Sequence, residues 1–186
     1  GHASPGSHNY LKASSSVFNP GTAGGFTIEF WARRDFADLD TVGVIVSFGD
    51  YGTLTSGDLM WIGFDRNDRV RLGIPSPGGE TTLDVAPADL NWHHWAFTYD
   101  GTTEEVRAYR DANLVFTEPS VPASTWAWDD VSGSLTIGNS DGRDYLTGLS
   151  GAVNNLRLWH TALTAEAIQN AMDKVQFGAT TGLVFE

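Results

Sequence analysis

The chain has 186 residues, of which 41% are hydrophobic and 12% aromatic, so it is long enough to bury a sizeable core in one domain. Its 11 Lys and Arg residues face 23 Asp and Glu residues, and the resulting formal net charge of −12 disfavours binding to nucleic acid or to anionic membranes. No apolar run is long enough for membrane insertion, and the absence of cysteine excludes disulfides, thiolate metal sites and a cysteine nucleophile.

Short segments of alternating hydrophobicity make up most of the sequence, and turn residues such as Asp, Asn and Gly separate them. In the first segment, apolar side chains occupy every second position, as in a strand with one buried face. The predicted strands are Phe26–Arg34, Gly43–Phe48, Leu59–Phe64, Val70–Ile74, Trp92–Tyr99, Glu105–Arg110, Leu114–Thr117, Ser134–Ile137 and Ala152–Trp159. So many short strands favour an all-β sandwich or jelly roll.

One short helix is predicted near the C-terminus. Thr164 is the expected N-cap, and Leu163 and Ile168 have the spacing of a hydrophobic staple. Together with Ile168, Ala171 and Met172 form an apolar stripe. We expect this stripe to pack on the sandwich rather than on a partner protein, because the apolar face of a helix usually serves its own core.

The two ends of the sequence differ from the rest. Residues 1–8 (GHASPGSH) are small and polar, and we expect a linker or vector-derived tail there, followed by a single domain over residues 9–186. Residues 182–186 (GLVFE) have the pattern of a strand. We therefore expect a module that has neighbouring domains in a longer chain.

Three regions resemble characteristic segments of the laminin-G-like, concanavalin A-like jelly-roll lectin family. They are residues 26–31 (FTIEFW), residues 92–101 (WHHWAFTYDG), and a closing region with LTIG at 135–138, GAVNNLRLW at 151–159 and ALTAE at 162–166. The resemblance covers residues 9 to 186 and implies an antiparallel two-sheet jelly-roll sandwich with one short helix. The chain departs from the family pattern at Ala112, where the hairpin usually has glycine, and at Asn154 and Asn155, where the family usually has two aspartates.

Three patterns that suggest catalysis have simpler structural explanations. His93 and His94 are neighbours on a predicted strand, so their side chains point to opposite faces and cannot bind one metal ion together. Residues 138–142 (GNSDG) match the G-x-S-x-G motif, but no predicted helix follows the serine. The E-x-D-x-x-E run of jelly-roll glucanases is absent. For the isolated Glu29, we expect an ion pair with Arg33 or contact with solvent rather than a catalytic role. The sequence therefore predicts no enzyme active site.

A loop rich in Asn and Asp is the candidate metal site. Asn139, Asp141 and Asp144 offer the hard oxygen ligands that Ca²⁺ prefers, and Asp129 and Asp130 precede the strand that leads into this loop. The family resemblance also implies Ca²⁺, because laminin-G-like domains often hold this ion at a loop rim. The alternative is turn formation alone, since Asn, Asp and Gly favour turns without any metal.

Aromatic residues mark the candidate ligand site. Trp126 and Trp128 are two positions apart, so in an extended segment both indoles face one side, where they can stack on a sugar ring. The expected ligand-binding residues are Trp126, Trp128, Asp129, Arg143, Tyr145 and Tyr51. The alternative is that these two indoles cover the edge of the sandwich, because Trp is highly buried on average. The remaining tryptophans, which we expect in the core, are Trp31, Trp61, Trp92, Trp95 and Trp159.

These residues and the family resemblance predict a non-catalytic binding module of a larger extracellular or cell-surface protein, such as a bacterial adhesin or a secreted multidomain protein. The expected partner is a carbohydrate or cell-surface glycan, and a peptide or protein is the alternative. Two other functions stay open. A glycan-active hydrolase or lyase would need convergent acid and base residues, and a structural spacer would bind no ligand.

Overall fold

The computed structural model describes residues 10–14, 24–36, 42–48, 60–76, 79–122, 134–139, 146–174 and 183–185. These ranges form strands and one helix. The elements are β1 (Leu11–Ser14), β2 (Gly25–Arg34), β3 (Val42–Phe48), β4 (Met60–Phe64), β5 (Arg69–Ser76), β6 (Gly79–Pro87), β7 (His93–Asp100), β8 (Glu105–Arg110), β9 (Asn113–Glu118), β10 (Ser134–Ile137), β11 (Leu146–Gly148), β12 (Gly151–Trp159), α1 (Ala165–Ala171) and β13 (Leu183–Phe185).

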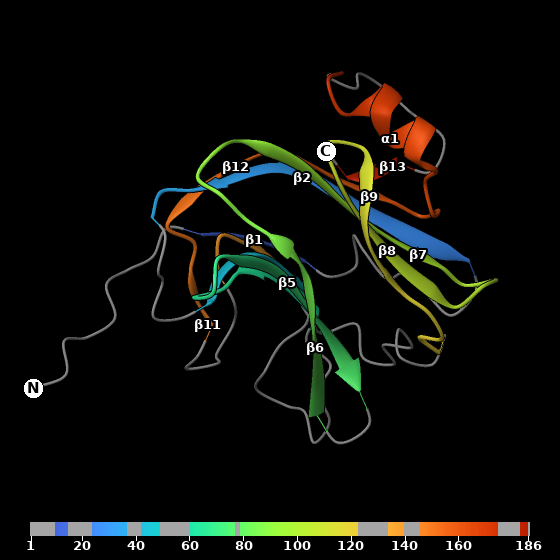
Figure 1. The fold of residues 1–186 in the computed structure, drawn as a ribbon, viewed down its shortest axis with the longest axis horizontal. Coiled ribbons are helices and arrows are strands. Elements are labelled where there is room, and N and C mark those ends of the chain that lie inside the picture. Colours follow the sequence, from blue (N-terminus) through green and yellow to red (C-terminus); the bar gives the residue numbers. More distant parts are fainter. Residues whose placement is uncertain are drawn as a thin grey trace, which may run out of the picture.

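The strands form two stacked sheets, and α1 lies on the outside of one of them (Figure 1). The first sheet has the strand order β1-β10-β3-β4-β5-β6, and β11 joins it by parallel pairing with β3. The second sheet has the order β13-β12-β2-β7-β8-β9, and we call it the helix-covered sheet. Among the described strands, all pairings except that of β11 are antiparallel. The predicted two-sheet jelly-roll sandwich with one short helix is confirmed.

The core lies between the two sheets, as the alternating pattern predicts. On β2, Phe26, Ile28 and Phe30 are buried in the core, and the ring of Phe30 stacks on that of Phe97 with 6.2 Å between centroids. Because successive side chains of a strand alternate between faces, the intervening residues of β2 point away from the core. Trp31 therefore lies on the outer face of the helix-covered sheet, together with Glu29.

The outer face of the first sheet holds a tryptophan that requires a glycine beside it. Trp61 of β4 pairs with Gly73 of β5 and is only 1% exposed, although it belongs to a small cluster separate from the main core. A Cβ atom at position 73 would lie 2.1 Å from the indole Nε1 of Trp61. The indole thus occupies the space above Gly73, and no larger residue fits there without displacing it.

Helix α1 begins and packs as predicted. The Thr164 hydroxyl accepts a hydrogen bond of 3.2 Å from the backbone N–H of Ala167, which is the expected cap. Ile168 is buried against Ala96 and Tyr109 on the outer face of β7 and β8. In the described part of the chain, no helix has the length and apolar character needed to cross a membrane.

The structure also differs from the predicted elements. β1, β6 and β11 have no counterpart among the predicted strands, whereas β13 falls in the strand-like segment at residues 182–186. β7 begins at His93 rather than at Trp92, and the Trp92 side chain is 42% exposed. The prediction that Trp92 belongs to the core was wrong, because the residue precedes the strand. Met172 lies just after α1 and is only partly buried.

Candidate functional site

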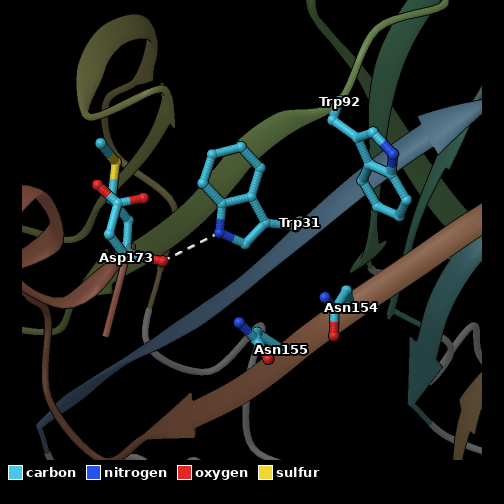
Figure 2. Close-up of a pocket in the computed structure, with 6 residues that line it drawn as sticks. Trp31, Trp92, Asn154, Asn155 and Asp173 are labelled. Carbon is cyan, nitrogen blue, oxygen red and sulfur yellow. Dashed lines mark hydrogen bonds between the residues drawn. The ribbon is translucent and has the colours of Figure 1, made fainter. Parts of the chain in front are cut away.

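A pocket of about 330 Å³ lies on the outer face of the helix-covered sheet, beside the end of α1 (Figure 2). Four parts of the chain contribute to it: β2, the segment before β7, the middle of β12 and the two residues that follow α1. The described residues that line it are Trp31, Trp92, Asn154, Asn155, Met172 and Asp173. Its volume lies at the lower end of the range of about 300–1,000 Å³ that is typical of ligand pockets.

Trp31 is held in place at the centre of the pocket. Its backbone pairs with Asn154 of β12 on one side and with His94 of β7 on the other. The indole Nε1 donates a hydrogen bond of 3.0 Å to the carbonyl oxygen of Met172, and the ring meets the His94 ring edge-on at a centroid distance of 5.5 Å. With its polar atom already paired, the indole offers its apolar surface to a ligand.

Trp92 is the more exposed of the two indoles. Figure 2 shows Trp92 and Asp173 on opposite sides of Trp31. The guanidinium carbon of Arg33 lies 5.6 Å from the centroid of the Trp92 ring, and Arg33 also forms an ion pair with Asp35. The cation over the ring restrains the orientation of Trp92, while 42% of the side chain stays accessible to a ligand.

Asn154 and Asn155 supply the polar groups of the pocket. They lie at a β-bulge in β12, where the register against β2 shifts between Asn154 and Arg157. Asn155 has a φ of 51°, in the left-handed region that Asn adopts more readily than most residues. An amide both donates and accepts hydrogen bonds, so this pair can bind groups such as hydroxyls that do the same.

A buried ionic cluster lies on the same sheet face and holds the segment after α1. Arg157 Nε lies 3.1 Å from Glu29 Oε1, and both side chains are fully buried. The indole Nε1 of Trp159 donates a hydrogen bond of 2.9 Å to the same carboxylate oxygen, and His94 Nε2 lies 3.3 Å from the other one. Arg157 Nη1 donates to the carbonyl oxygen of Ala171 at 2.8 Å. The cluster therefore ties β12 to the residues that form one wall of the pocket.

The environment of Glu29 differs from the predicted one. Neither Arg33 nor solvent neutralises Glu29; its partners are Arg157 and His94.

The two histidines point to opposite faces, as predicted. His93 Nδ1 lies 2.7 Å from Asp111, and its Nε2 lies 3.1 Å from Asp89.

Among the residues around His93, Asp89 has a strongly lowered pKa. Burial acts to raise the pKa of Asp89. Hydrogen bonds from the Asn91 backbone N–H, from His93 and from Arg110 outweigh this effect and lower the pKa to about 2. The Asp89 carboxylate is therefore ionised throughout the neutral range and serves as a structural anchor for the loop before β7.

The predicted calcium and aromatic sites fall mostly outside the described residues. This applies to Asp141 and Asp144 of the predicted metal site and to all six predicted ligand-binding residues, Trp126, Trp128, Asp129, Arg143, Tyr145 and Tyr51. Asn139 is described, and its carbonyl oxygen accepts a hydrogen bond of 3.2 Å from the Ser47 hydroxyl. Within the described ranges, no group of three or more His, Asp or Glu side chains could hold a metal ion. Both sites stay predictions.

Sequence reasoning assigned two of the pocket residues to the core. Trp31 shares its strand face with polar residues, and Trp92 follows Asn91 just outside the strand, so both carried a signal of surface position. Asn154 and Asn155 stood out in the sequence because they replace the family's usual aspartates, but nothing there indicated that they line a pocket.

The comparisons with known proteins agree with the fold. The Laminin_G_3 family model, described as the concanavalin A-like lectin/glucanases superfamily, matches residues 5–169. No curated protein matches the chain. Among solved structures, a heptameric SAP-like pentraxin from Limulus polyphemus is 17% identical with a TM-score of 0.56, and the match covers 78% of this chain and 68% of the pentraxin.

Two further solved structures are binding domains. The CBM40 domain of the Ruminococcus gnavus IT-sialidase, solved with α2,3-sialyllactose bound, is 12% identical with a TM-score of 0.62; the match covers 79% of this chain and 82% of that one. The binding domain of a botulinum neurotoxin of serotype D/C is 15% identical with a TM-score of 0.65, over 90% of this chain and 41% of that one. Because the sequence identities are so low, these structural matches show a shared fold and nothing more. By the match of the family model to most of its length, the chain belongs to the concanavalin A-like lectin/glucanases superfamily.

Proposed function

We propose that the chain is a non-catalytic carbohydrate-binding module and that the pocket around Trp31 and Trp92 is its sugar-binding site. The observation that carries this proposal is the combination of two indoles with two amides in one small pocket. The C–H faces of a sugar ring pack on indoles, and its hydroxyls exchange hydrogen bonds with amides. The superfamily and the solved binding domains support it.

The pocket chemistry favours binding over catalysis. Glycoside hydrolysis needs two carboxyl groups on either side of the scissile bond. Asp173 is the one acidic residue among the described residues that line the pocket. A hydrolase or lyase is therefore the weaker alternative, and incubation with a panel of polysaccharides tests it, since release of new reducing ends or unsaturated products would establish turnover.

Binding of the chain to a glycan array, followed by calorimetry on the best ligand, tests the proposal. Trp92→Ala should reduce affinity at least tenfold, because it removes one of the two stacking surfaces. Phe36→Ala is the matched control, since Phe36 is an aromatic side chain that is 65% exposed and does not line the pocket. Equal loss in both variants, or unchanged affinity in Trp92→Ala, would contradict the assignment of the site.

We place the module in a secreted or cell-surface protein, in keeping with the binding domains that share its fold.

Two further parts of the proposal rest on the sequence. One is a Ca²⁺ ion at Asn139, Asp141 and Asp144, and the other is a second aromatic contact at Trp126 and Trp128. Glycan binding measured with and without EGTA tests the metal. Trp128→Ala tests the second contact: it should weaken glycan binding and leave the melting temperature nearly unchanged, whereas a large fall in melting temperature would mean that the indole is a core residue.

A further inference from the structure

We propose that the pocket selects neutral sugars over acidic ones and that Asp173 makes this selection. The inference rests on the proposed carbohydrate binding and adds the class of ligand. It starts from the charge of the pocket. The five other described lining residues are two tryptophans, two asparagines and a methionine, so Asp173 carries the only formal charge among them.

An acidic sugar brings its own carboxylate into this pocket. Two like unit charges about 5 Å apart in water repel each other by an energy that corresponds to roughly a fourfold loss of affinity. The net charge of −12 adds repulsion of the same sign over longer distances. An acidic ligand would need a cation in the pocket to offset both effects.

The cations close to the pocket either pair with a carboxylate or lie outside the pocket lining. Arg33 lies over Trp92, but it pairs with Asp35. Arg157 is fully buried and pairs with Glu29, and its Nη1 donates to the carbonyl oxygens of Ala171 and Lys174. Lys174 follows Asp173 in the chain and is exposed, but it does not line the pocket.

A neutral sugar meets a complete set of complementary groups. The Asp173 carboxylate accepts hydrogen bonds from hydroxyls, and the amides of Asn154 and Asn155 both donate and accept them. Asparagine at these two positions also limits the negative charge of the pocket to one group. Aspartate at both positions would triple that charge and remove two amide NH2 groups, which are the donors for sugar oxygens.

The matched variants are Asp173→Asn and Glu166→Gln. Both remove one negative charge from an exposed carboxylate, and Glu166 lies in the first turn of α1 and does not line the pocket. Affinities are measured for the methyl glycosides of galactose and galacturonic acid, of glucose and glucuronic acid, and for lactose and 3′-sialyllactose. Each is measured at low and at physiological ionic strength.

In every pair that binds, the wild-type chain should prefer the neutral member several-fold. Asp173→Asn should raise affinity for the acidic member roughly fourfold without a similar gain for the neutral one, while Glu166→Gln leaves their ratio unchanged. The preference should shrink as salt screens the charges. A preference for acidic sugars, or an unchanged ratio in Asp173→Asn, overturns the inference and leaves the proposed function intact. Absence of binding to every glycan, on this panel and on the array, overturns both.

Discussion

Arg157 and Glu29 form an ion pair that is closed to solvent on the outer face of a sheet. Their atoms Nε and Oε1 lie 3.1 Å apart, and both side chains have an exposed fraction of zero. Such burial is unusual for an outward-facing position and is accompanied by Trp159, which donates to the same carboxylate. The pair fixes the end of α1 on the sheet, and with it the pocket wall at Met172 and Asp173.

Glu29→Gln should lower the free energy of unfolding by about 3–5 kcal/mol, because it leaves the Arg157 charge buried without a counterion. Chemical denaturation measures this. Glu105→Gln is the control: it removes one partner of the ion pair with Arg107, whose side chains are 19% and 40% exposed, so the loss should stay below about 1 kcal/mol. Equal losses in the two variants would contradict the structural role of the buried pair.

Gly73→Ala should destabilise the first sheet, since the new Cβ would collide with the Trp61 indole at 2.1 Å. We expect a loss of about 1–3 kcal/mol in urea denaturation, which is typical of overpacking. Gly24→Ala provides the comparison, because a Cβ there has nothing within 4 Å, and its effect should be small. Substituting Trp61 by Leu in the Gly73→Ala background should recover part of the loss that the collision causes.

Asp89 should contribute to stability in a pH-dependent way. Its pKa is lowered from 3.8 to about 2 in the folded chain, so its contribution is complete above about pH 4 and is lost as the pH falls towards 2. Asp89→Asn should therefore be less stable than the wild type at neutral pH, and the difference should vanish near pH 2. Equal stability of Asp89→Asn and the wild type at neutral pH would contradict this contribution.

Thr164→Ala should cost about 1 kcal/mol of stability, because the backbone N–H of Ala167 loses the hydroxyl that caps α1. Thr164→Ser keeps the hydroxyl and should stay within a few tenths of the wild type. Thermal denaturation of the three proteins distinguishes the loss of the cap from the loss of a methyl group. If Ser and Ala were equally destabilising, the hydroxyl would not be the stabilising group.

The predicted calcium loop is testable without any ligand. A site filled at 100 times its dissociation constant adds about 2.7 kcal/mol to stability, so the melting temperature should rise in Ca²⁺ relative to EDTA. Asp141→Ala should abolish this rise. Identical melting curves with Ca²⁺ and EDTA would leave turn formation as the role of Asn139, Asp141 and Asp144.

Local patterns sufficed to predict most of the fold. The period of two on β2 separates core residues such as Ile28 from outward-facing ones such as Trp31, and the Thr164 cap identifies the start of α1. β11 escaped prediction because three residues are too few to show a period. β6 (GETTLDVAP) has few large apolar residues, since it lies at the edge of its sheet.

The pocket was harder to predict because it depends on contacts between distant parts of the sequence. Trp31 and Met172, joined by a hydrogen bond, are 141 residues apart. Nothing in either local segment indicates this partner. The same holds for Glu29, whose partner Arg157 comes from the strand that pairs with β2 near the end of the domain.

The bulge in β12 has a consequence for how such a pocket can vary. Asn154 and Arg157 are three positions apart, yet they face Trp31 and Glu29, which are two positions apart on β2. Asn155 is thus the extra residue of the bulge. In a chain without it, the remaining side chains of the strand would still point alternately towards the core and away from it. Gain or loss of a single codon therefore adds or removes a pocket-lining residue within a sheet, whereas most insertions in proteins occur in loops.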